Sequence, residues 1–125
     1  MHRGFHLIEL MIVVGIISLL TVIAIPLYSQ YMVKAKRLTA EATLMKMAAA
    51  LERYFILHNR YEGATLSRLG FSKEEVRQYE FKLHLTASGY QIKAIPKDDQ
   101  AEKDAACGTL SLDSRGTKSL RECWS

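Results

Sequence analysis

Residues 10–25 read LMIVVGIISLLTVIAI, a run without a single charged side chain. Only Gly15, Ser18 and Thr21 interrupt the aliphatic series. An apolar helix of roughly 20 residues is needed to cross about 30 Å of hydrocarbon. As a helix that rises about 1.5 Å per residue, the wider stretch Phe5–Tyr28 is about 36 Å long. This stretch therefore predicts a membrane segment rather than part of a soluble core.

The composition limits what the rest of the chain can be. The protein has 125 residues, of which 49% are hydrophobic, and this predicts one small domain. Such a size excludes an enzyme with separate cofactor and substrate modules. The 17 Lys and Arg residues exceed the 13 Asp and Glu residues only mildly, and they are spread along the chain instead of forming one basic block.

The residues around the apolar segment predict whether it is cleaved off and how it is oriented in the membrane. A secretory signal ends in a small-residue cleavage site, and no such site follows this segment at a suitable distance, so we expect the segment to be retained. Arg3 is the only Lys or Arg ahead of it. The positive-inside rule then places the N-terminus in the cytoplasm and the rest of the chain outside.

Glu9 lies within this apolar surrounding and has two interpretations. A carboxylate inside a membrane helix costs about 2.5–3.5 kcal/mol on insertion scales, so such groups usually have a cationic partner. In one interpretation, Glu9 sits at the headgroup level near a helix N-terminus, whose dipole favours an anion. In the other, a cation from a second chain faces it.

The string GFHLIELMIVVGIISLLTVIAIPLY, residues Gly4–Tyr28, resembles the N-terminus of type IV prepilins and their pseudopilin relatives. The resemblance implies that residues 1–4 are a leader, which a prepilin peptidase removes by cutting between Gly4 and Phe5. It also implies N-methylation of Phe5, and neutralisation of the Phe5 amine by Glu9 of a neighbouring subunit. Residues 5–28 would then be first an inner-membrane anchor and later the core of an extracellular filament.

The pattern after Pro26 predicts that the helix continues. Pro26 lacks a backbone donor, so we expect a kink between about Val22 and Pro26. Beyond it, apolar positions recur every three or four residues, at Ala40, Leu44, Met47, Leu51, Tyr54 or Phe55, and His58. A second stripe runs through Tyr31, Ala35, Leu38, Ala42 and Met45 and would face neighbouring subunits. We therefore predict one helix from Phe5 to about His58, too long for a small domain to bury alone.

Residues 29–125 form the predicted head. After the helix, its sequence predicts an antiparallel sheet of three to four strands that packs on the helix, and the fold class is therefore α+β. Alternating polarity indicates strands at 79–85, 90–95 and 108–113, with a short fourth at 117–120. Ser72 is a plausible cap for a turn at 73–76. Residues 97–106 are polar and charged, and are expected to form a solvated surface loop.

Cys107 and Cys123 flank the last predicted hairpin. In an exported chain they are expected to form a structural disulfide. The alternatives, a metal pair or a redox couple, lack support because there is no Cys-x-x-Cys motif and neither His58 nor His84 has a partner at ligand spacing. The ending ACGTLSLDSRGTKSLRECW, with SGYQIKAIP upstream, resembles the head of PilE-type pilins, in which a cystine closes a C-terminal loop.

No catalytic pattern is recognisable. The sequence has no Gly-x-Ser-x-Gly elbow and no phosphate-binding glycine loop, so the protein is predicted not to be an enzyme and to need no cofactor. The acidic residues of the 97–106 segment lack an EF-hand pattern, and no metal is expected there.

The resemblance implies a subunit of a type IV pilus that serves twitching motility, adhesion or DNA uptake, and the short head favours a minor subunit. Its partners would be other pilins, the prepilin peptidase and the inner-membrane assembly machinery. An alternative is a pilin whose head binds DNA during transformation; another is a pseudopilin of type II secretion. The candidate DNA contacts are basic side chains near the predicted disulfide: Lys93, Lys97, Lys103, Arg115, Lys118 and Arg121.

Overall fold

A computed structural model describes residues 4–124. The chain divides into two units, Met1–Met32 and Val33–Ser125. Residues 1–3 of the predicted leader and Ser125 of the predicted head lie outside the described residues. The division into leader, anchor and head stays a prediction.

One long helix, α1 (Leu7–His58), confirms the predicted helix and starts two residues later than expected. It continues through Pro26 without a break, and the kink expected there stays a prediction. The helix ends where Asn59 adopts a left-handed conformation with φ of 57°. Its N–H donates to the carbonyl oxygen of Phe55 over 2.6 Å, which satisfies one of the last carbonyls of the helix.

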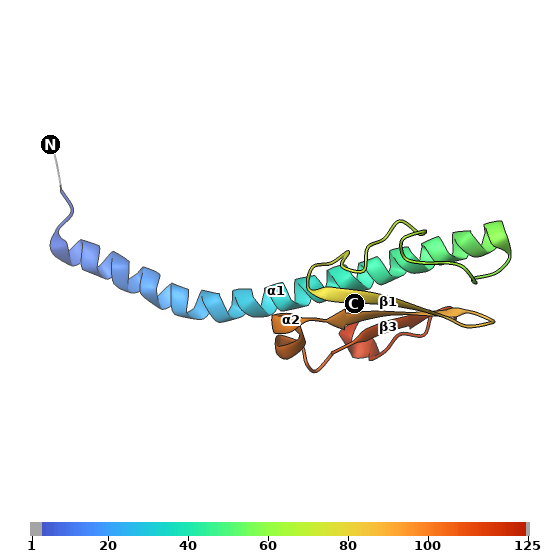
Figure 1. Cartoon of the computed structure of the whole chain (residues 1–125). Coiled ribbons are helices and arrows are strands. Elements are labelled where there is room, and N and C mark those ends of the chain that lie inside the picture. The colour runs from blue at the N-terminus through green and yellow to red at the C-terminus, as the bar shows by residue number, and fades with distance from the viewer. Residues whose placement is uncertain (1–3, 125) are drawn as a thin grey trace. The chain divides into compact units, whose positions relative to one another are not determined.

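The Val33–Ser125 unit has a three-stranded antiparallel sheet in the order β1-β2-β3 (Figure 1). Its strands are β1 (Tyr79–Leu85), β2 (Tyr90–Pro96) and β3 (Leu110–Asp113). Residues directly opposite in register, such as Phe81 and Ala94, share a face of the sheet. This face is buried in one core with the predicted helix stripe: Ala40, Leu44, Met47, Leu51, Phe81, Ile92, Ala94 and Leu110. The predicted α+β fold is confirmed.

The predicted strands at the C-terminal end need two corrections. β3 begins at Leu110 instead of 108, because Gly108 has a left-handed φ of 53° that does not fit a strand. The expected fourth strand at 117–120 is wrong: this segment makes only a single bridge, between Leu112 and Lys118. Leu120 then takes a φ of 43°, which turns the chain away from the sheet.

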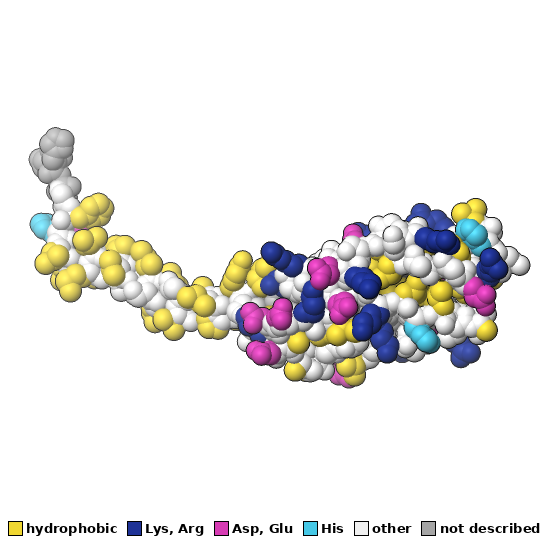
Figure 2. Space-filling view, viewed as in Figure 1, with side chains coloured by type: hydrophobic (Ala, Val, Ile, Leu, Met, Phe, Trp, Pro, Cys, Tyr) yellow, Lys and Arg dark blue, Asp and Glu magenta, His cyan; other side chains and the backbone are white. Residues whose placement is uncertain are grey.

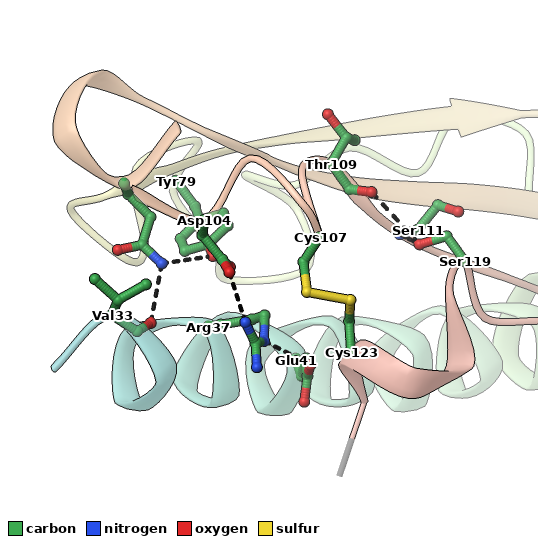
Figure 3. Close-up of a disulfide and its surroundings, with 11 residues drawn as sticks. Val33, Arg37, Glu41, Tyr79, Asp104, Cys107, Thr109, Ser111, Ser119 and Cys123 are labelled. Atoms are coloured by element: carbon green, nitrogen blue, oxygen red, sulfur yellow. Dashed lines mark hydrogen bonds and ion pairs between the residues drawn. A yellow bond between two sulfur atoms is a disulfide. The ribbon is translucent and has the colours of Figure 1, made fainter. Parts of the chain in front are cut away.

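The predicted solvated loop at 97–106 is also wrong. It contains a short helix, α2 (Asp98–Lys103), whose Gln100 is buried. The Gln100 amide donates to the Val33 carbonyl oxygen and to the Tyr79 hydroxyl, each over 3.0 Å (Figure 3). Asp104, which follows α2, is buried beside Arg37 of α1. These contacts join the polar segment to the core of the head.

Candidate assembly segment and nucleic-acid interface

The N-terminal site residues lie at the start of α1. Gly4 and Phe5 precede the helix and are exposed, and a side chain at position 4 would meet no described atom within 4 Å. Glu9 is exposed in the first helical turn. A carboxylate at this position gains from the helix dipole. Within residues 4–124, its carboxylate has neither a hydrogen bond nor an ion pair, so a cation from outside this chain can approach it.

The apolar part of α1 is uncovered. Every large hydrophobic side chain from Phe5 to Leu27 is exposed, and hydrophobic side chains cover this part of the chain in Figure 2. α1 is the one helix among the described residues that is long and apolar enough to cross a membrane. An apolar surface this extensive marks a segment that meets lipid or protein.

The predicted disulfide is confirmed. Cys107, after α2, and Cys123, in the 3-10 helix η1 (Arg121–Cys123), are bonded with 5.8 Å between their Cα atoms (Figure 3). The bond ties the C-terminal segment to the segment that carries Asp104. It thereby sets where the basic residues between β3 and Cys123 lie.

A tight turn after β3 positions those residues. The Asp113 carboxylate accepts the backbone N–H groups of Arg115 and Thr117, at 3.0 and 2.9 Å. Gly116 has a φ of 82°, a conformation that few other residues adopt without strain. The returning chain then places Lys118 opposite Leu112.

Two of the six predicted basic contacts come together after this turn. Lys118 and Arg121 line a hollow of about 340 Å³ with Gly116 and Trp124. The Lys118 ammonium lies 5.1 Å from the centre of the Trp124 ring, a cation–π contact. Arg121 is exposed and has no ion pair among the described residues. This arrangement offers two positive charges to a phosphate.

The other four basic residues lie elsewhere in the head. Lys93 is exposed on β2, where its neighbours in the strand, Ile92 and Ala94, face the core. Lys97 is paired with Glu74, with 3.4 Å between Nζ and Oε1. Lys103 is exposed at the end of α2 and Arg115 is exposed in the turn after β3. None of these four side chains lines the hollow of Lys118 and Arg121.

Two further residues were not predicted from the sequence. Trp124 was overlooked because a single aromatic residue near a chain end carries no periodic signal. Lys82 lies directly opposite Lys93 in the β1–β2 register, so two positive charges share the outer face of the sheet. Periodicity alone could have found this pair, since both strands were predicted with nearly their observed bounds. Within residues 4–124, no three His, Cys, Asp or Glu side chains gather as metal ligands would.

Comparison with known proteins finds several relatives. Residues 26–111 match the family model described as "Type IV minor pilin ComP, DNA uptake sequence receptor". The type IV major pilin protein PilA of Myxococcus xanthus is 33% identical over 92 residues, which cover 74% of this chain and 41% of that protein. A type IV major pilin protein PilE1 of Neisseria gonorrhoeae is 26% identical over 114 residues, covering 90% of this chain and 52% of its own length. The chain therefore spans about half the length of these curated relatives or less.

A solved structure supports the same grouping. The structure of a type IV pilin from Shewanella oneidensis superposes with a TM-score of 0.61 at 31% sequence identity. The match covers 74% of this chain and 98% of that one.

Proposed function

The chain belongs to the type IV pilin family, and on this premise we propose that it is a minor subunit of a type IV pilus. In this proposal the protein is held in the inner membrane by residues 5–28, with its N-terminus in the cytoplasm. It is then transferred into an extracellular filament of pilin subunits. The filament would serve twitching motility, adhesion or DNA uptake.

The observation that carries the proposal is the uncovered apolar half of α1 with a carboxylate at its start. Lipid can cover the apolar side chains before assembly, and sister helices can cover them afterwards. Among residues 4–124, Glu9 has no cationic partner, and an uncompensated charge in an apolar core is strongly destabilising. Removal of residues 1–4 by a prepilin peptidase would free the Phe5 amine, and a neighbour's amine would neutralise Glu9.

Filament assembly of a Glu9→Val variant tests this proposal. Membrane insertion should persist because the substitution removes a costly charge from an apolar segment. The variant should nevertheless be missing from sheared pili, while the matched control Ser18→Ala, in the same segment but without a charge change, should be incorporated. Incorporation of Glu9→Val at the level of the unmodified protein would contradict the role of the charge.

Deletion of the protein separates a pilus subunit from a pseudopilin. If the deletion abolished secretion and left the pili intact, a pseudopilin would be favoured.

A second function, reception of DNA for uptake, is supported by two observations. The matched family model carries the description of a DNA uptake sequence receptor. The hollow of Lys118, Arg121 and Trp124 combines two cations with an aromatic residue, and cations of this kind contact the phosphates of nucleic acid. We propose that this hollow contacts the DNA backbone.

Duplex binding by the full chain in detergent micelles tests this second proposal. Each phosphate contact contributes a slope of about −0.9 to the dependence of log affinity on log salt. The double variant Lys118→Gln/Arg121→Gln should bind more weakly and with a shallower salt slope. The control Lys103→Gln/Lys97→Gln removes equal charge elsewhere and should change binding less. The site would be excluded if both double variants lost the same duplex affinity. It would also be excluded if the unmodified protein bound no duplex at low salt in a gel-shift assay.

A further inference from the structure

A second hollow lies at the C-terminal end of α1, away from the residues considered so far. It has a volume of about 500 Å³, and it is formed by the last turns of the helix and by the loop between α1 and β1. Its lining combines basic, aromatic and apolar side chains: Ala50, Arg53, Tyr54, Leu57, His58, Arg68 and Leu69. In Figure 2, Lys and Arg side chains lie over this end of α1 as they do over other parts of the head.

The charge of this hollow is one-sided. Arg53 comes from α1 and Arg68 from the loop, and no carboxylate of the described residues lines the hollow. The acidic neighbour Glu52 is engaged elsewhere: its Oε1 accepts the hydroxyl groups of Tyr61, at 3.1 Å, and Tyr90, at 3.3 Å. Arg53 has no ion pair among the described residues. The two guanidinium groups thus present uncompensated positive charge to an anion.

The hollow also has a stacking platform. The rings of Tyr54 and His58 are stacked, with 4.0 Å between centroids and 18° between planes. The Nδ1–H of His58 donates to the Tyr54 carbonyl oxygen over 3.0 Å, because a carbonyl can only accept, and this bond holds the imidazole in place. His58 is exposed beside the exposed Leu57, so the imidazole and an apolar side chain are open to a flat ligand.

Stabilisation of the helix end accounts for only part of this arrangement. Basic side chains near a helix C-terminus interact favourably with its dipole, and His58 also bonds one of its last carbonyls. Arg68 lies outside the helix, and its Nη1 donates to the Gly63 carbonyl oxygen over 3.1 Å. The guanidinium retains further N–H donors for a phosphate. Neither the helix dipole nor this bond explains why Arg53 and Arg68 line one hollow with a stacked ring pair.

We propose that this hollow binds an unstacked nucleotide of single-stranded nucleic acid. Arg53 and Arg68 would contact the phosphate, and the base would stack on His58. Cations that follow the backbone, combined with aromatic rings that take successive bases, are the arrangement by which proteins hold single strands. The inference rests on the proposed function for the presence of DNA at the head. It uses a surface separate from the Lys118 and Arg121 hollow.

Fluorescence anisotropy with a labelled oligothymidine tests the inference, using the full chain in detergent micelles. The double variant Arg53→Gln/Arg68→Gln should bind the single strand about ten-fold more weakly or worse, since two phosphate contacts are lost. Arg60→Gln is the matched single-charge control, because Arg60 is exposed at the same helix end but does not line the hollow. Arg60→Gln should reduce the affinity for oligothymidine less than either single variant, Arg53→Gln or Arg68→Gln.

Substitutions at His58 separate stacking from charge. His58→Phe keeps an aromatic ring and should retain most single-strand affinity, whereas His58→Ala should lose it. Equal affinities of the Phe and Ala variants, or inorganic tripolyphosphate competing as well as oligothymidine at equal phosphate, would overturn the role of the base. No oligothymidine binding by the unmodified protein would also overturn the inference. If substitution of Lys118 and Arg121 still weakened duplex binding in that case, the proposed DNA receptor function would stand without the single-strand site.

Discussion

The Arg37 guanidinium on α1 and the buried Asp104 carboxylate after α2 form a part-buried ion pair, with 2.6 Å between Nη1 and Oδ1 (Figure 3). Glu41, one helical turn after Arg37, places its Oε1 3.9 Å from the Arg37 Nε. Arg37 therefore interacts with two carboxylates, those of Asp104 and Glu41. Through Asp104 it holds the segment between β2 and Cys107 against the helix.

Removal of one partner of this pair should be costly. A buried charge that loses its partner typically destabilises a protein by about 3–5 kcal/mol. Arg37→Gln should therefore reduce the free energy of unfolding by a few kcal/mol, measured by chemical denaturation in micelles. The pair of Lys97 and the exposed Glu74 provides the control, and Lys97→Gln should cost about 1 kcal/mol or less. Similar losses in both variants would show that Arg37 does not compensate the buried charge of Asp104.

Loss of the disulfide should loosen the head. Cys107 and Cys123 are separated by 16 positions, and a loop of this length stabilises the folded state by about 3 kcal/mol in the chain-entropy model. Cys107→Ala/Cys123→Ala should lower the melting temperature, and a reducing agent should lower that of the unmodified protein to a similar value. A melting temperature that does not respond to either change would refute a stabilising role.

Three tyrosines should make the stability of the head fall at alkaline pH. Burial is the main cause that raises the pKa of Tyr61, Tyr79 and Tyr90 above the ordinary value of 10.0, and the nearby Glu52 raises it further for Tyr61 and Tyr90. The unfolded chain ionises first, so this stabilisation is complete below pH 10 and is lost as the pH rises through the folded-state pKa values. Denaturation at a series of pH values measures the effect.

The Glu52→Gln variant tests the electrostatic part of these shifts. Removal of the carboxylate should lower the pKa of Tyr90, followed by phenolate absorbance, without restoring the ordinary value, because burial remains. Glu102→Gln, an exposed carboxylate on α2, should leave the titration as it is. An unchanged titration in Glu52→Gln would contradict the interaction.

Processing should depend on position 4. Gly4 is exposed and a side chain there would meet no atom of residues 5–124, so Gly4→Val should not disturb the fold. It should block the peptidase, whose active site must approach the bond after Gly4. Mass spectrometry of membranes should then find the precursor with residues 1–4 attached. Normal cleavage of the Gly4→Val chain would show that the bond after Gly4 is not the processed one.

The predictable parts of the fold are those with a local pattern. β1 has the predicted bounds of Tyr79–Leu85 because its side chains alternate between the core and the solvent. α2 was missed because its composition is that of a solvated loop, and its burial depends on contacts of Gln100 with Val33 and Tyr79. The prediction of a fourth strand was wrong for two reasons. The Ser119 hydroxyl, not a backbone carbonyl, accepts the Ser111 N–H over 2.9 Å, and the chain then turns at Leu120.

The candidate sites show the same division. Gly4, Phe5 and Glu9 stand at fixed spacing in a contiguous motif, and their roles stay predictions. The meeting of Lys118 and Arg121 with Trp124, and of Arg53 with Arg68, depends on turns and on a loop that no periodicity describes. Charge composition alone placed six basic residues in one group, whereas the structure gathers two of them in one hollow.

Mass analysis of sheared filaments tests the central claim most directly, because it reports N-terminal processing and incorporation in one spectrum. The account predicts that the protein is present in the filaments as a chain that begins at Phe5, carries one added methyl group and has both cysteines oxidised. Recovery of the protein only from membranes, with residues 1–4 still attached, would contradict it.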